Sequence, residues 1–115
     1  MEYKRMLCWV RPHEKKELKE AVNGQFPLEF ARNFDDFKNK INKDDYLIMS
    51  MTKISIGWNK MYRLIENHNN LQFHLFDKKF GKYTVKELLF LNMRKNIINK
   101  KYYADELVDE FNVHS

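Results

Sequence analysis

The sequence predicts an α/β domain with a doubly wound, mainly parallel sheet of five strands and helices on both faces. Short, nearly continuous apolar runs recur along the chain, as expected for strands that are buried on both faces. Amphipathic segments with apolar residues at helical spacing separate these runs. The chain has 115 residues, of which 43% are hydrophobic, with only three Gly and two Pro. We therefore expect one globular domain over residues 1–115.

The first half of the chain alternates strand and helix patterns up to a central apolar run. Pro12 stops the first strand, and the Asn-Gly pair at 23–24 ends the helix that follows. Pro27 places the second strand near a sheet edge, and Asn33 or Asp35 is suited to cap a short helix. The predicted elements are strand 3–10, helix 13–22, strand 26–31, helix 34–41 and strand 46–51.

The second half continues the alternation with less regular patterns. An apolar stripe at helical spacing ends at the polar residues 67–70, and Thr84 is suited to cap a later helix. The segment before residue 100 is short and polar, and it is interpreted as the last strand. The predicted elements are helix 58–65, strand 71–76, helix 85–94, strand 96–99 and helix 104–111.

Charge and cysteine content set the expected environment. Twenty-one Lys and Arg against sixteen Asp and Glu give a formal net charge of +5, but the two signs are interleaved as on solvated helix faces. The one cysteine, Cys8, excludes an internal disulfide and is expected in the core, which favours a reducing cytoplasm. No apolar run approaches the ~18 residues of a membrane span. We therefore expect a cytoplasmic protein that has no contact with a membrane.

The polar residues show no pattern typical of a catalytic or metal-binding site. The four histidines lack the spacing of a zinc site and are interpreted as surface or satisfied core residues. No Ser, His and Asp pattern supports nucleophilic catalysis, and the three glycines are too dispersed for a phosphate loop. We expect no enzymatic activity, no cofactor and no bound metal.

The order and spacing of the predicted elements resemble the receiver domains of bacterial response regulators. The resemblance covers the chain from Lys4 to about Val113. Its most specific part is the closing segment, where Lys100-Lys101-Tyr102 precedes Glu106-Leu107, much as Lys-Pro-Phe precedes Glu-Leu in many receivers. The resemblance implies a receiver, or flavodoxin-like, fold.

The residues at the phosphorylation pocket depart from the receiver pattern. Arg11 and Pro12 stand where receivers have an acidic pair, Ser50 or Met51 where they have the phosphoaccepting Asp, and Asp77 where they have Thr or Ser. Only the lysine, Lys100, is retained. The resemblance therefore implies a degenerate receiver, or pseudo-receiver, without the usual metal or phosphoryl group.

Two readings of these departures remain open. Because the carboxyl ends of parallel strands meet in one crevice, Arg11 and Lys100 are placed to hold Asp77 in a fixed ion pair. Alternatively, Arg11 and Asp77 point into solvent, where ion pairs contribute only about 0–1 kcal/mol.

The resemblance implies a regulatory or protein-interaction module in signalling or transcription control. Receivers commonly dimerise or dock through their last elements, so we expect a protein partner or a homodimer at residues 85–111. Phe90, Tyr102 and Tyr103 are the candidate anchors, because aromatic residues concentrate binding energy at interfaces.

The alternative function is that of a small basic nucleic-acid-binding protein. Lys38, Lys40 and Lys43 lie close together, and basic residues accompany Tyr102 and Tyr103. The final predicted helix argues against DNA contact because it contains four acidic residues: Asp105, Glu106, Asp109 and Glu110.

Overall fold

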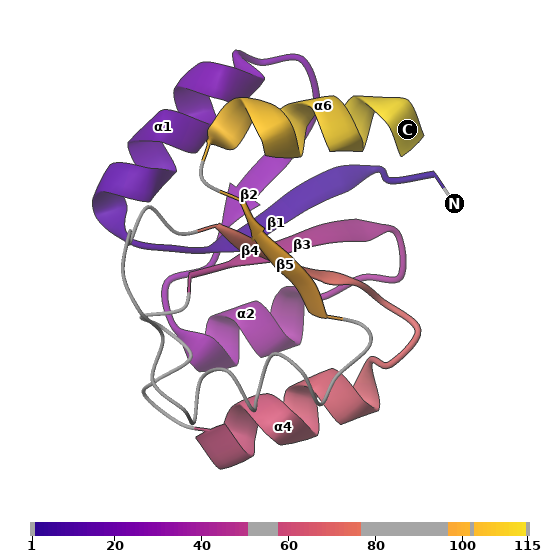
Figure 1. The fold of residues 1–115 in the computed structure, drawn as a ribbon. Coiled ribbons are helices and arrows are strands. Elements are labelled where there is room, and N and C mark those ends of the chain that lie inside the picture. Colours follow the sequence, from indigo (N-terminus) through magenta and orange to yellow (C-terminus); the bar gives the residue numbers. More distant parts are fainter. Residues whose placement is uncertain (1, 51–57, 77–96, 102, 115) are drawn as a thin grey trace.

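The computed structural model describes residues 2–50, 58–76, 97–101 and 103–114. Strands and helices alternate up to residue 76, and one strand and one helix follow after residue 96 (Figure 1). In chain order the elements are β1 (Arg5–Trp9), α1 (Pro12–Val22), β2 (Leu28–Phe30), α2 (Phe34–Lys40), β3 (Asp45–Met49), α4 (Trp58–Asn67), β4 (Phe73–Phe76), β5 (Ile97–Lys101) and α6 (Ala104–His114). The helix predicted over residues 85–94 lies outside the described residues. No helix among the described residues is long and apolar enough to cross a membrane.

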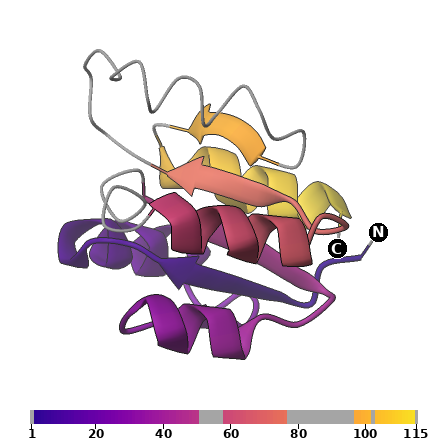
Figure 2. The same ribbon diagram turned by 90° about the horizontal axis from the view of Figure 1, so that it is seen from below.

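The strands form one parallel sheet in the order β2-β1-β3-β4-β5. Helices α1 and α6 cover one face, and α2 and α4 cover the other, as Figure 1 and the turned view in Figure 2 show. The predicted α/β class with a parallel sheet is confirmed. The strand order is compatible with a receiver-like arrangement, which is one of the two common doubly wound orders.

Local signals in the sequence determine where the first helices begin and end. Pro12 not only stops β1 but also opens α1, because proline is well suited to the first position of a helix. Asn23 and Gly24 end α1 with φ angles of 49° and 72°. Of the two candidate caps of α2, Asn33 is the one used, since its Oδ1 accepts the N–H of Asp36 over 2.9 Å.

The central strands are buried on both faces, which accounts for their nearly continuous apolar sequence. Two separate clusters of buried side chains result. The first lies between the sheet and α2 and α4 and includes Trp9, Phe37, Leu47, Leu64 and Phe73. The second lies under α1 and α6 and includes Met6, Leu18, Tyr46, Phe76 and Phe111. Cys8 is fully buried in this second cluster, as predicted.

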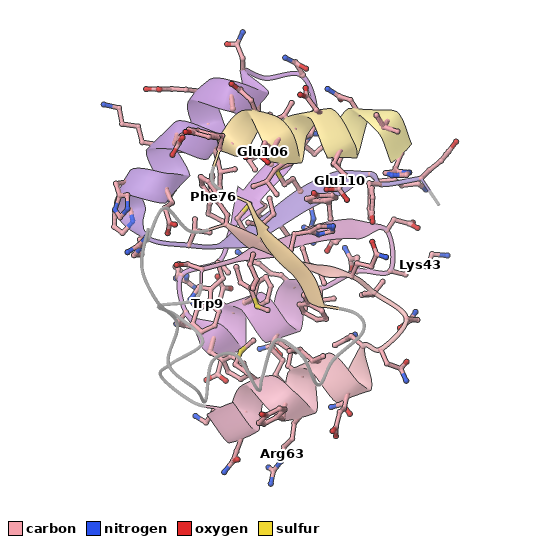
Figure 3. The ribbon with its side chains drawn as sticks, viewed as in Figure 1. Trp9, Lys43, Arg63, Phe76, Glu106 and Glu110 are labelled. Carbon is pink, nitrogen blue, oxygen red and sulfur yellow. The ribbon has the colours of Figure 1, made fainter. Side chains whose placement is uncertain are left out.

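Polar contacts among three side chains, those of Tyr46, His74 and Glu110, join α6 to the sheet. The Tyr46 hydroxyl donates to Oε2 of Glu110 over 3.0 Å, and His74 Nε2 lies 3.4 Å from the other carboxylate oxygen. His74 Nδ1 lies 3.1 Å from the Leu47 carbonyl, and its ring stacks on Tyr46 with 3.8 Å between centroids. Burial, followed by the charge of Glu110, raises the pKa of Tyr46 far above its ordinary value of 10.0. Figure 3 shows Glu110 on the side of α6 that faces the sheet.

The side chain of Arg5 joins three elements at the amino end of β1. Its Nε and Nη2 donate to the two carboxylate oxygens of Asp45, over 2.9 and 2.7 Å. Nη2 also donates to the carbonyl of Lys40 over 2.7 Å, and Nη1 donates to Glu29. The Asp45 side chain is 2% exposed, so this bidentate pair stabilises a buried charge. The hydrogen bond to Asp45 is also the main reason that the pKa of Arg5 is raised.

We expect Arg5→Lys to lower the free energy of unfolding by about 1–3 kcal/mol. An ammonium group lacks the planar fork that bonds Asp45 bidentately while it reaches Lys40 and Glu29. Urea denaturation followed by circular dichroism measures the loss. Arg32→Lys is the matched control, because the Arg32 side chain is 85% exposed and should change stability by less than about 0.5 kcal/mol. Equal losses in the two variants would contradict the role given to Arg5.

The buried thiol predicts a pH dependence of stability. Burial raises the pKa of Cys8 well above 9.0, whereas in the unfolded chain the thiol ionises near pH ~8.5. Above that pH the unfolded chain binds fewer protons than the native protein, so the free energy of unfolding falls as pH rises. Between about pH 8.5 and 9.5, this fall should be steeper in the wild-type protein than in Cys8→Ala. Denaturation at several pH values measures the slopes, and identical slopes would refute the prediction.

Candidate functional site

The carboxyl ends of β1 and β3 lie side by side, and the residues after them form one edge of the sheet. Trp9 and Met49 are paired in register, and the N–H of Ser50 donates to the Trp9 carbonyl over 3.2 Å. The strand order reverses between β1 and β3, which is where open α/β sheets hold their ligands. The structure therefore brings Arg11, Pro12 and Ser50 to this edge, with Ser50 fully buried.

Arg11 is the N-cap of α1, and its side chain lies against Glu14 in the first turn. The backbone N–H and Nε of Arg11 donate to Glu14 Oε1 over 3.0 and 2.9 Å, and Nη2 donates to Oε2 over 3.2 Å. The Glu14 side chain is 0% exposed and that of Arg11 is 27% exposed. A buried carboxylate requires both a counter-charge and hydrogen bonds, and Arg11 supplies them. Both carboxylate oxygens of Glu14 are therefore already bonded.

The side chains at this edge limit its chemistry. Arg11 contributes a cation and Pro12 contributes no side-chain ligand, whereas Mg²⁺ prefers several oxygen ligands. Ser50 carries a hydroxyl, which cannot form the acyl phosphate of an aspartate. Within residues 2–50, 58–76, 97–101 and 103–114, no group of three or more His, Cys, Asp or Glu side chains is arranged to hold a metal ion.

The other predicted site residues are placed only in part. Asp77, Phe90 and Tyr102 lie outside the described residues, and Lys100 lies within β5. The hypothesis that Arg11 and Lys100 hold Asp77 stays a prediction, although Arg11 already has Glu14 as a partner. Tyr103 is 59% exposed at the start of α6, and its N–H donates to Glu106 Oε1 over 3.1 Å.

Sequence reasoning missed the importance of Glu14. Because Glu and Lys residues are interleaved along 14–20, Glu14 looked like part of a solvated face. A usable signal was present, since a Glu three residues after the N-cap reaches back to the N-cap backbone in a capping box. Pro12 marked the start of the helix and so fixed that spacing.

A groove with basic side chains lies between α2 and α4. It has a volume of about 280 Å³ and is lined by Phe34, Asp35, Lys38, Lys60, Arg63, Leu64, Asn67 and His68. We call it the basic groove, because three cationic side chains face one carboxylate. Lys38, Lys60 and Arg63 are all exposed, and Figure 3 shows Arg63 projecting from α4 away from the sheet.

The lysine cluster that suggested nucleic-acid binding is divided in the structure. Lys40 lies 3.2 Å from carboxylate oxygens of both Glu29 and Asp36, so its charge is balanced internally. These hydrogen bonds raise the pKa of Lys40. Lys38 instead belongs to the basic groove. Its partners there, Lys60 and Arg63, lie three residues apart on α4, and their spacing was the overlooked signal.

A second groove, of about 290 Å³, lies on the other side of the sheet between α1 and α6. It is lined by Glu17, Glu20, Ala21, Tyr103, Ala104 and Asp105. We call it the acidic groove, because the described residues that line it include three carboxylates and no cationic side chain. The exposed Tyr103 ring is its largest side chain.

We expect Arg11→Ala to lower the free energy of unfolding by about 1–3 kcal/mol, and by more than Glu14→Gln does. The first change leaves a buried carboxylate without its counter-charge, whereas the second removes that charge and keeps an acceptor oxygen. The double variant should lose less free energy of unfolding than the sum of the losses in the two single variants, as measured by chemical denaturation. Lys16→Ala, at an exposed position of the same helix, is the control. Strictly additive losses would show that the two side chains do not depend on each other.

Compared with protein-family models, with curated proteins and with solved structures, the chain matches none.

Proposed function

We propose that this chain is a non-catalytic regulatory or protein-interaction module of the receiver type, and that it acts without phosphorylation. The pair formed by Arg11 and Glu14 carries the proposal. It places a guanidinium at the carboxyl end of β1, where the receiver family has its acidic pair. The parallel sheet supports the comparison, since β1 and β3 bring Arg11 and Ser50 to one edge.

The Arg11–Glu14 pair disfavours both parts of the usual switch. A divalent cation would need free carboxylate oxygens, but those of Glu14 accept hydrogen bonds from Arg11. Freeing them would leave a buried carboxylate without its counter-charge. This edge is therefore held in one state, whereas the same edge of a receiver alternates between two.

Exposed apolar side chains on the last helix support an interaction role. Tyr103 and Val113, at the two ends of α6, are 59% and 77% exposed. Exposed aromatic side chains such as that of Tyr103 concentrate binding energy at protein interfaces. This surface favours a protein partner or a second copy of the chain over a small-molecule substrate.

We expect incubation with acetyl phosphate and Mg²⁺ to add no phosphoryl mass, as measured by intact-protein mass spectrometry. A receiver domain with a complete acidic pair, treated in parallel, verifies the reagent. The melting temperature should also be unchanged by Mg²⁺. Arg11→Asp is the matched variant, because it frees Glu14 and should make the melting temperature rise with Mg²⁺. An acyl phosphate on the wild-type chain, recognised by its lability to hydroxylamine, would overturn the proposed function.

A further inference from the structure

The basic groove and the acidic groove have complementary side chains. In the basic groove, Lys38, Lys60 and Arg63 surround an apolar wall that includes Phe34 and Leu64. These three cations make no ion pair with any residue in the described part of the chain. The groove thus offers positive charge beside an apolar surface, which suits an acidic partner with an aromatic or aliphatic anchor.

The acidic groove presents those features. Glu20 and Asp105 are exposed, and Tyr103 protrudes between the two helices that carry them. The hydrogen bond from the Tyr103 N–H to Glu106 fixes the backbone at this point, so the residue that carries the ring has a defined place at the start of α6. Less conformational freedom is then lost when the ring is buried at an interface.

The positions of the grooves determine how two copies would meet. Because α1 and α6 lie on one face of the sheet and α2 and α4 on the other, the grooves cannot meet within one molecule (Figure 1). A pair related by a two-fold axis would not join both grooves at once, since they face opposite ways. Contacts between unlike surfaces instead join copies head to tail.

We propose that the basic groove binds the acidic groove of a second copy of this chain, with Tyr103 as the anchor. This inference rests on the proposed interaction role and names the partner. The Tyr103 ring packs against the partly exposed Phe34, while Glu20 and Asp105 lie opposite Lys60 and Arg63. The cations also lie within reach of the ring face, which adds cation–π attraction.

A nucleic acid fits the basic groove less well. Asp35 lines the groove and repels phosphates, and the apolar wall offers nothing to a phosphate backbone. The acidic groove of another copy of the chain complements the basic groove, so no other ligand is needed to balance its charge.

Ionic strength separates this contact from general charge effects. Copies with a net charge of +5 repel one another, and added salt screens that repulsion. Association governed by net charge would therefore strengthen with salt. Association through the two grooves weakens with salt, because it depends on opposite charges at close range.

The test measures the weight-average mass by sedimentation equilibrium over a range of protein concentrations, at low and high salt. The wild-type mass should rise with concentration at low salt, beyond that of a dimer, and return to the monomer value at high salt. Lys60→Glu/Arg63→Glu and Glu20→Lys/Asp105→Lys should each weaken association by about tenfold or more. Tyr103→Ala should weaken it without changing the charge. An equimolar mixture of the two charge-reversed variants should associate again, since each retains one unchanged groove.

Lys16→Glu/Lys43→Glu is the matched control. It changes the net charge as much as the basic-groove variant does, at exposed lysines outside both grooves, and should not weaken association. Circular dichroism verifies that each variant is folded. The proposal is overturned if the wild type stays monomeric at low salt, if the control loses association equally, or if the basic-groove variant loses only the binding of duplex DNA. The first two results leave the proposed function standing, because phosphorylation of the chain is what refutes it. The third result would favour the nucleic-acid-binding alternative.

Discussion

The guanidinium of Arg5 ties together the amino ends of the elements on which the sheet is built. Its bonds to Asp45, Glu29 and the Lys40 carbonyl align β1 with β3, β2 and the end of α2. The register of β1 and β3 then brings the two carboxyl ends level, from Arg5 opposite Asp45 to Trp9 opposite Met49. The edge that holds Arg11 and Ser50 is therefore positioned by a charged contact at the opposite end of the same strands.

Internal pairing also changes the meaning of the net charge. Arg5, Arg11 and Lys40 each lie against carboxylates of the same chain, so they contribute little to the field outside the molecule. The charge available to a partner comes from side chains such as Lys60 and Arg63 on one face and Asp105 on the other. The formal value of +5 therefore conceals two grooves of opposite character in the described part of the chain.

The fold could be predicted because its signals are local. Apolar runs marked β1 and β3, Pro12 marked the end of the first strand, and Asn33 was one of the two candidate caps of the second helix. The site could be predicted only in part, because its contacts join distant residues. Arg5 and Asp45 are 40 positions apart, and nothing near either one indicates the other. Glu14 was hidden for a different reason, since a buried carboxylate and a solvated one have the same sequence context in a helix rich in Glu and Lys.

The two hydrophobic clusters differ in how much of the chain each needs. The described members of the cluster under α2 and α4 run from Leu7 to Leu75, whereas those of the cluster under α1 and α6 run from Tyr3 to Phe111. During synthesis, the described members of the first cluster are therefore complete once residue 75 has emerged, while those of the second are complete only when the last helix emerges. In that interval, the apolar surface under α1 is a natural target for chaperones.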